Sequence, residues 1–102
     1  MSFRLVISTA AVADMEAAAI WYEDRQTGLG HKFLAEIRKG FQNVQSSPER
    51  YPYADEDKEW RFHLLAAPFR YYKIIYQIKA DQITVVAVFH TSQDPEIWQA
   101  RD

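Results

Sequence analysis

The chain has 102 residues, 48% of them hydrophobic, and this length suits one compact domain spanning residues 1–102. Its 12 basic and 14 acidic side chains give a formal charge of −2, which excludes the overall positive field that non-specific nucleic-acid binding usually requires. There is no cysteine for disulfides or thiolate metal ligands, and no apolar run reaches the length of a membrane-spanning helix. We therefore expect a cytoplasmic protein that does not bind membranes.

The first residues predict a short strand followed by a helix. Phe3, Leu5 and Ile7 alternate with other residues, which is typical of a strand, here expected at the edge of a sheet. Ser8 or Thr9 can cap a helix from about residue 10 to about residue 26. The apolar stripe that this helix is expected to bury consists of Val12, Met15, Ala19 and Tyr22.

A second helix is expected from about residue 30 to about residue 45, after the break at Gly28 and Gly30. Its apolar stripe consists of Phe33, Ile37, Phe41 and Val44. The link between the two helices is so short that they should form an antiparallel hairpin. Gly40 lies inside the second helix, as a weak point or as a place of close helix approach.

Residues 46–59 have no usable period and predict a loop. The loop contains an acidic run with the sequence Asp55-Glu56-Asp57-Lys58-Glu59. No strand or helix is available to aim these carboxylates at one point, so a solvated turn is favoured over a metal site. The three histidines also lack close ligand spacing, and we expect neither a metal nor a cofactor.

Three stretches rich in β-branched and aromatic residues, at 60–65, 69–78 and 83–90, predict an antiparallel meander. Side chains alternate across a strand, so each stretch divides into two faces. The sets expected to face the core are Tyr72, Ile74, Tyr76 and Ile78, and Ile83, Val85, Ala87 and Phe89. If these sets align, the open face carries the best candidates for function, namely Arg61, His63, Tyr71, Lys73, Gln77 and His90.

The tail after His90 predicts a turn and a short helix, with Asp94 as its cap and Pro95 in its first turn. Trp98 and Arg101 allow two interpretations. The favoured one is that Trp98 docks the tail on the sheet and that Arg101 bonds back to the domain. The alternative is that the tail reaches a target.

Several short motifs follow one another over almost the whole chain. They are Asp14-Met15, Gly28-Leu29-Gly30 with Phe33 to Ile37, Ser47 to Pro52, Arg61 with Leu64-Leu65, Tyr72 to Tyr76, Val86 to His90, Asp94 to Trp98, and Arg101. In this order and spacing the chain resembles toxins of the RelE/ParE superfamily, also called plasmid stabilisation proteins, of type II toxin–antitoxin modules. The resemblance implies an α+β fold with an N-terminal strand, an antiparallel helix hairpin, a three-stranded antiparallel meander and a short C-terminal helix.

Two functions are implied by this resemblance. In the ParE-like branch, which we favour, the protein would inhibit growth by binding DNA gyrase and stabilising cleaved DNA. The target-binding residues would then be Arg61, His63, Tyr71, Trp98 and Arg101. In the RelE-like branch it would be a ribosome-dependent endoribonuclease that activates a ribose 2′-hydroxyl of mRNA, with Arg61, Lys73 and His90 as catalytic residues. A slightly acidic chain without a dense Lys/Arg cluster is a poor RNA binder.

A third alternative is an antitoxin-binding homologue without toxicity. The resemblance also implies a partner, an antitoxin encoded beside the gene, which would form a hetero-oligomer with this chain. A segment of that antitoxin is expected to fold along the helix hairpin and the sheet edge. Its apolar contacts would be residues left over from the core, for which the candidates are Trp21, Leu29 and Leu34.

Overall fold

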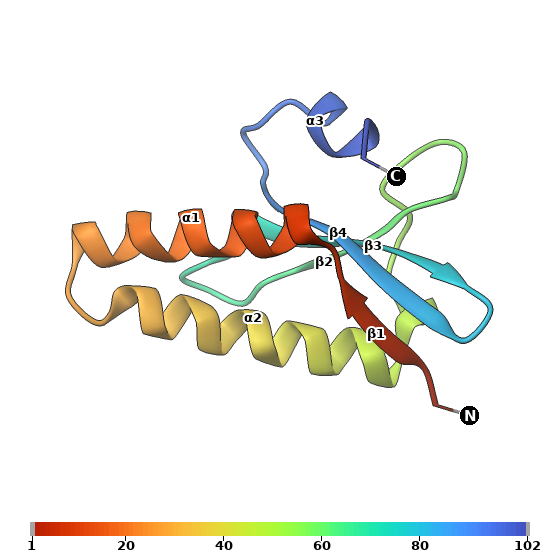
Figure 1. Ribbon diagram of the computed structural model, residues 1–102, viewed down its shortest axis with the longest axis horizontal. Helices are drawn as coiled ribbons and strands as arrows, with labels where there is room; N and C mark the ends of the chain where they lie inside the picture. Colours follow the sequence, from red (N-terminus) through yellow and green to blue (C-terminus); the bar gives the residue numbers. More distant parts are fainter. Residues whose placement is uncertain (1, 102) are drawn as a thin grey trace.

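A four-stranded sheet carries a helical hairpin on one face in residues 2–101, which the computed structural model describes (Figure 1). The strands are β1 (Arg4–Ile7), β2 (Arg61–Leu64), β3 (Tyr72–Lys79) and β4 (Gln82–His90), in the order β1-β4-β3-β2. Strands β2, β3 and β4 form the expected antiparallel meander, and β1 lies at an edge, as predicted. β1 pairs with β4 in parallel, so the sheet is mixed.

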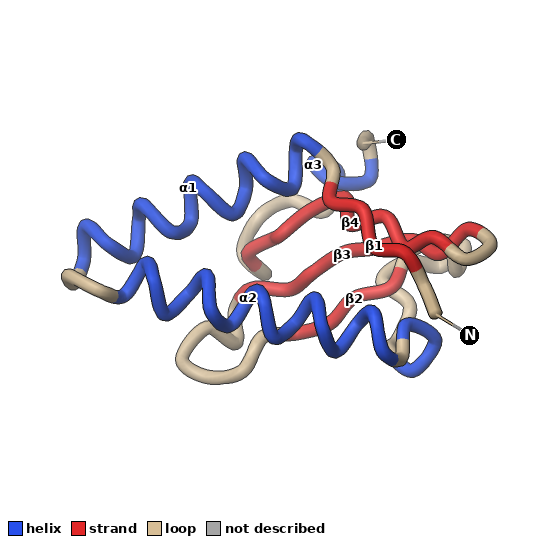
Figure 2. Tube along the Cα trace, turned by 60° about the horizontal axis from the view of Figure 1, so that its bottom comes forward, coloured by secondary structure: helices blue, strands red, loops and turns tan. Residues whose placement is uncertain are grey.

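The helices are α1 (Thr9–Arg25), α2 (Leu29–Ser46) and α3 (Glu96–Gln99), with a 3₁₀ turn, η1, at Pro48–Arg50. Figures 1 and 2 show α1 and α2 side by side and antiparallel, with their connection projecting beyond the sheet. This confirms the predicted hairpin. No helix in residues 2–101 combines the length and apolar character needed to cross a membrane.

Local hydrogen bonds explain where the two long helices begin. Ser8 Oγ accepts a hydrogen bond from the Ala11 N–H at 3.1 Å, so Ser8 is the cap of α1. At the hairpin turn, the Glu23 carboxylate accepts hydrogen bonds from the N–H groups of Gly28 at 2.8 Å and Gly30 at 3.0 Å. The bond from Gly28 is the main reason why the pKa of Glu23 is lowered. Glu23 therefore supplies the cap that the glycine at the start of α2 lacks.

The helices bury largely the residues that their periodicity predicts. Phe33, Ile37 and Val44 of α2 are fully buried. In α1 the buried residues are Ala11 and Ala18, while Val12 is 38% exposed. The stripe expected on α1 was therefore wrong at Val12, because the helix is turned so that Ala11 faces the sheet.

Two glycines permit close packing. A Cβ added at Gly30 would lie 2.6 Å from the Ala19 carbonyl oxygen, so Gly30 marks the close approach of the two helices. A Cβ added at Gly40 would lie 2.6 Å from Ile74 Cδ1 and 3.2 Å from Leu65 Cδ2. Gly40 is thus a point of close approach, as one of the two alternatives expected, but it lets α2 approach the sheet rather than another helix.

A β-bulge in β4 divides the residues expected to share one core face. Ile75 lies opposite Ala87 while Tyr76 lies opposite Val85, so Val86 is an extra residue and the side-chain phase of β4 reverses there. The first predicted set is confirmed, since Tyr72, Ile74, Tyr76 and Ile78 all pack in the helix-facing core with Ile83 and Val85. The prediction was wrong for Ala87 and Phe89, which belong to a second core on the other face of the sheet.

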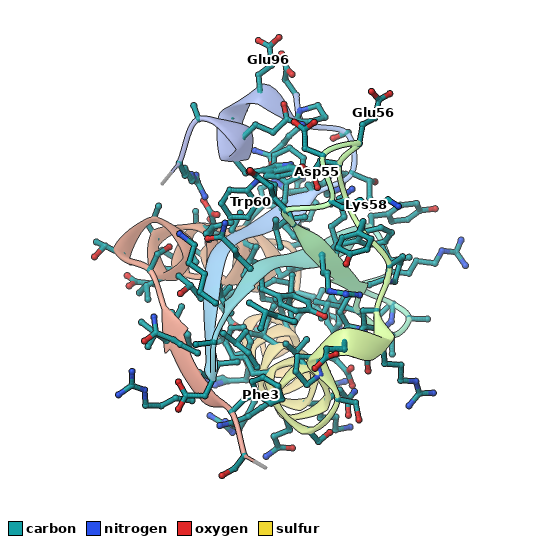
Figure 3. The ribbon with its side chains drawn as sticks, turned by 90° about the vertical axis from the view of Figure 1, so that its right-hand side faces the viewer. Phe3, Asp55, Glu56, Lys58, Trp60 and Glu96 are labelled. Atoms are coloured by element: carbon teal, nitrogen blue, oxygen red, sulfur yellow. The ribbon has the colours of Figure 1, made fainter. Side chains whose placement is uncertain are left out.

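This second face is covered, although the sequence predicted it to be open. The covering residues are Trp98 of α3, which is 1% exposed, and Trp60, which is 6% exposed. Their rings meet edge to face with centroids 5.9 Å apart, and Figure 3 shows Trp60 between the sheet and α3. The favoured interpretation of Trp98, docking of the tail on the sheet, is confirmed.

Candidate functional site

The residues expected to share one open face lie on opposite sides of the sheet. Arg61 pairs with Tyr76 and His63 pairs with Ile74, which places both on the helix side. Lys73 pairs with Phe89 and therefore faces the second core. The predicted grouping was wrong because the register between β2 and β3 decides which residues of β2 face the helices, and the sequence of β2 alone does not show this register.

Arg61 is engaged in bonds that hold the segment before β2. Its Nη1 donates to the carbonyl oxygens of Glu49 at 3.1 Å and Tyr51 at 2.6 Å. Its Nη2 donates to Tyr53 Oη at 2.9 Å, and the guanidinium lies 4.1 Å from the centroid of that ring. The side chain therefore ties residues 49–53 to the sheet edge.

His63 and Lys73 both pack against aromatic rings. The His63 ring lies 4.4 Å from that of Tyr51, and burial is the main reason why its pKa is lowered, with a further effect of the Arg50 charge. The Lys73 ammonium lies 5.0 Å from the Phe62 ring centroid, and burial lowers its pKa.

His90 organises the turn that leaves β4. Its Nδ1 accepts a hydrogen bond from the Ser92 N–H at 3.0 Å and lies 2.7 Å from Ser92 Oγ. Its backbone N–H donates to Gln93 Oε1 at 3.0 Å. The ring stacks on Tyr71 at 6.1 Å and meets Tyr72 edge to face at 5.0 Å. The described contacts of His90 are thus those of a residue that fixes the turn.

Arg61, Lys73 and His90 therefore do not converge. Lys73 lies on the opposite face of the sheet from Arg61 and His90. Arg61 and His90 face the same side, but β3 lies between their strands, and their partners on β3, Tyr76 and Tyr72, are four residues apart. Strand geometry gives a Cα separation of roughly 16 Å between Arg61 and His90. One phosphodiester cannot contact all three side chains in this arrangement.

Asp14 in α1 joins the tail to the body of the domain, a role that the sequence did not reveal. Its carboxylate accepts hydrogen bonds from Arg101 Nη1 at 2.7 Å and Nη2 at 3.1 Å, and from the Val88 N–H at 3.1 Å. Arg101 Nη1 also donates to the Val86 carbonyl oxygen at 3.0 Å. The expected back-bonding of Arg101 is confirmed, and we call these contacts the tail latch.

A hollow of about 540 Å³ lies between α1, the end of the sheet and the turn after β4. Figure 1 shows this turn leaving the sheet beside α1 on its way to α3. We call it the aromatic hollow after five rings that line it, those of Trp21, Tyr22, Tyr71, Tyr72 and His90. These rings come from three elements or their ends, so no local sequence pattern could have identified the hollow.

The comparison with protein families covers most of the chain. Residues 5–95 match the family described as the ParE toxin of the type II toxin–antitoxin system parDE. The chain belongs to the ParE toxin family. A chain of the chromosomal ParDE toxin–antitoxin system from P. aeruginosa has a TM-score of 0.76 and 15% sequence identity, covering 87% of this chain and 96% of that chain. At that identity the likeness shows the fold alone. The search of curated proteins gives no match.

The residues expected to contact an antitoxin differ in exposure in this ParE-family protein. Trp21 is 50% exposed and lines the aromatic hollow. Leu29 and Leu34 are partly buried against the helix-facing core. Of the three, Trp21 offers the largest free apolar surface to a partner.

The side chains predicted to bind a target also differ. Tyr71 is 51% exposed and lines the aromatic hollow, whereas Trp98 is buried. Arg61, His63 and Arg101 have intermediate exposure, with the contacts given above.

The acidic run forms a turn. The Asp55 carboxylate accepts hydrogen bonds from the N–H groups of Glu59 and Trp60. Within residues 2–101, no group of three or more potential metal ligands is placed to hold an ion. Figure 3 shows this turn near α3, with Asp55 and Glu56 on the same side of the molecule as Glu96.

Proposed function

We propose that this ParE-family protein is the toxin of a type II toxin–antitoxin pair, and that it inhibits growth in the cytoplasm by binding DNA gyrase and stabilising cleaved DNA. The observation that carries the contact mechanism is the dispersal of Arg61, Lys73 and His90. A ribonuclease needs a base, an acid and a cation within reach of one phosphodiester. These three side chains lie on two faces of the sheet.

The charge of the chain supports the same choice. The formal charge is −2, and the guanidinium of Arg61 is bonded to the oxygens of three residues of its own chain. An mRNA substrate would have to displace these bonds before Arg61 could hold a phosphate. A protein target needs no such rearrangement, because exposed side chains such as Tyr71 are already available.

The proposal includes an antitoxin encoded by the neighbouring reading frame, since a growth inhibitor must be neutralised in its own host. Family membership and the likeness to a chain of a ParDE system support this partner. We expect a stable hetero-oligomer in which a segment of the antitoxin lies along the hairpin and the sheet edge.

The test is induced expression with and without the neighbouring reading frame, combined with mapping of mRNA ends on translating ribosomes. The proposal predicts growth arrest with intact mRNA, and rescue together with co-purification when the antitoxin is co-expressed. Codon-phased mRNA cuts that vanish in His90→Ala or Arg61→Ala would contradict the gyrase proposal and support the ribonuclease function instead. A stable complex without any growth arrest would identify an antitoxin-binding homologue that is not toxic.

A further inference from the structure

The aromatic hollow is bounded by one continuous series of ring contacts. Trp21 meets Tyr22 at 5.2 Å, and Tyr22 lies 6.0 Å from Tyr72. Tyr72 meets His90 at 5.0 Å, and His90 stacks on Tyr71 at 6.1 Å. Trp21 and Tyr71, the two ends of the series, are half exposed. The chain thus leaves two large rings uncovered at the mouth of one hollow.

An arginine guanidinium lies over each of these two exposed rings. The Arg25 guanidinium lies 4.4 Å from the Trp21 ring centroid. The Arg70 guanidinium lies 5.3 Å from the Tyr71 ring centroid, and its Nη2 donates to Tyr71 Oη at 3.3 Å. This hydrogen bond is the main reason why the pKa of Tyr71 is lowered. The carboxylate that lines the hollow, that of Asp14, is already paired with Arg101.

The geometry points to an acidic segment of the antitoxin as the occupant of the aromatic hollow. We propose that this segment inserts one aromatic or aliphatic side chain between Trp21 and Tyr71 and places its carboxylates against Arg25 and Arg70. This inference rests on the proposed function, because the antitoxin is the partner defined there.

Size, lining and charge each support this occupant. A volume of about 540 Å³ lies within the range of roughly 300 to 1,000 Å³ that is usual for ligand pockets. The lining includes Val88 and Ala18, which offer apolar contact and no charge. Exposed tryptophan, tyrosine and arginine side chains are the types that dominate binding energy at protein interfaces. The two arginines disfavour a cationic ligand and attract carboxylates.

The test measures the affinity of the purified protein for the full-length antitoxin by calorimetry. Trp21→Ala should raise the Kd by about 30-fold or more, as expected for a central aromatic anchor. Ile20→Ala is the matched control, because Ile20 is 63% exposed on the same helix but does not line the hollow. It should change the Kd by a clearly smaller factor than Trp21→Ala does, because Ile20 lies on the hairpin that the antitoxin segment follows but outside the hollow.

Two further variants test the same hollow while Trp21 stays in place. Ala17 lines the hollow and is exposed, so Ala17→Trp should fill the hollow and weaken binding by at least about tenfold. Arg25→Glu should also weaken binding by about tenfold at low salt, and less at high salt. Arg38→Glu, an exposed charge reversal on α2, should have a much smaller effect.

The outcomes separate the inference from the proposed function. If Trp21→Ala and Ala17→Trp bind the antitoxin as tightly as the wild type, the hollow is not the anchor site, although the toxin–antitoxin pair stands. If the wild-type protein binds no antitoxin, the proposed function fails and the inference with it. If sedimentation shows self-association that Trp21→Ala abolishes while antitoxin binding is unchanged, the occupant is a second copy of the chain and the inference is overturned.

Discussion

The tail latch should contribute measurably to stability, and removing Arg101 is the most informative perturbation of it. Arg101 reaches from the tail to Asp14 in α1 through two N–H donors, at 2.7 and 3.1 Å. The side chains of Arg101 and Asp14 retain 24% and 22% of their exposure, so the pair is neither fully solvated nor buried. Its contribution should lie between that of an exposed ion pair and that of a buried one.

Exposed ion pairs contribute about 0.2 to 1 kcal/mol, and hydrogen bonds to charged groups about 1.5 to 3 kcal/mol. We therefore expect Arg101→Ala to lower the free energy of unfolding by about 1.5 kcal/mol. For a chain of this length the entropy of unfolding is roughly 0.2 kcal/mol per kelvin, which converts this loss to a fall in Tm of about 7 °C.

Differential scanning calorimetry of Arg101→Ala, Asp14→Asn and the double variant measures the effect. Asp14→Asn retains an oxygen that can accept the Val88 N–H, so it removes mainly the charge. The double variant should be little less stable than Arg101→Ala. The interaction free energy between Arg101 and Asp14 obtained from this double-mutant cycle should be about 1 kcal/mol. Arg38→Ala, at an exposed position on α2, should change the free energy of unfolding by less than about 0.5 kcal/mol.

The latch should also keep Trp60 and Trp98 covered. Arg101→Ala should therefore shift the emission of the tryptophans to longer wavelength before global unfolding. A Tm within 2 °C of the wild type, roughly the change that 0.4 kcal/mol produces, or fully additive effects of the two single variants, would refute the reasoning.

Three other changes test separate parts of the fold. Gly30→Ala should destabilise the protein by about 1 to 3 kcal/mol despite the higher helix propensity of alanine, because the added methyl group would meet the Ala19 carbonyl oxygen; chemical denaturation measures this. Tyr76→Phe should reduce the free energy of unfolding by about 1 to 3 kcal/mol, because the buried hydroxyl donates to the Pro48 carbonyl oxygen, which would lose its partner. Because burial lowers the pKa of His63, stability should fall as the pH drops from about 6.5 towards that lowered value, and His63→Gln should flatten this dependence in denaturation series at several pH values.

Each of these changes has its own control or its own contradicting result. Gly28→Ala meets no atom within 4 Å, so its effect reports the strain of a φ of +89° rather than a clash, and a similar loss in both variants would argue against the contact at Gly30. For Tyr76, an unchanged denaturation midpoint would contradict the assigned hydrogen bond. For His63, a pH slope that is unchanged in His63→Gln would contradict the assigned effect of burial.

The helical half of the fold could be predicted because its pattern has one strong period. In α2 the apolar residues recur on one face, and Phe33, Ile37 and Val44 are buried accordingly. In α1 the small residues around Ala11 and Ala18 are almost as apolar as Val12, so the pattern did not define which of them faces the sheet. In a helix rich in alanine, the sequence pattern indicates only weakly which face is buried.

The candidate site was harder to predict because face assignment depends on register. Thr84 to Phe89 is apolar nearly throughout, so no alternation marks the bulge at Val86. The face of the sheet on which Arg61 lies likewise depends on its pairing with Tyr76. This pairing joins two different strands, so the residues around Arg61 do not reveal it. The docking of Trp98 was predictable, since a large aromatic in a short terminal helix has few other ways to be buried.

The most direct test of a contact mechanism is a supercoiling and cleavage assay with purified DNA gyrase and the purified protein in the absence of antitoxin. The account predicts loss of supercoiling and accumulation of gyrase–DNA cleavage complexes, both reversed by added antitoxin. It predicts the same activity for Lys73→Ala, because Lys73 faces the second core and a contact mechanism requires no catalytic cation there. Unaffected gyrase at saturating protein, in a preparation that arrests growth when expressed, would contradict the central claim.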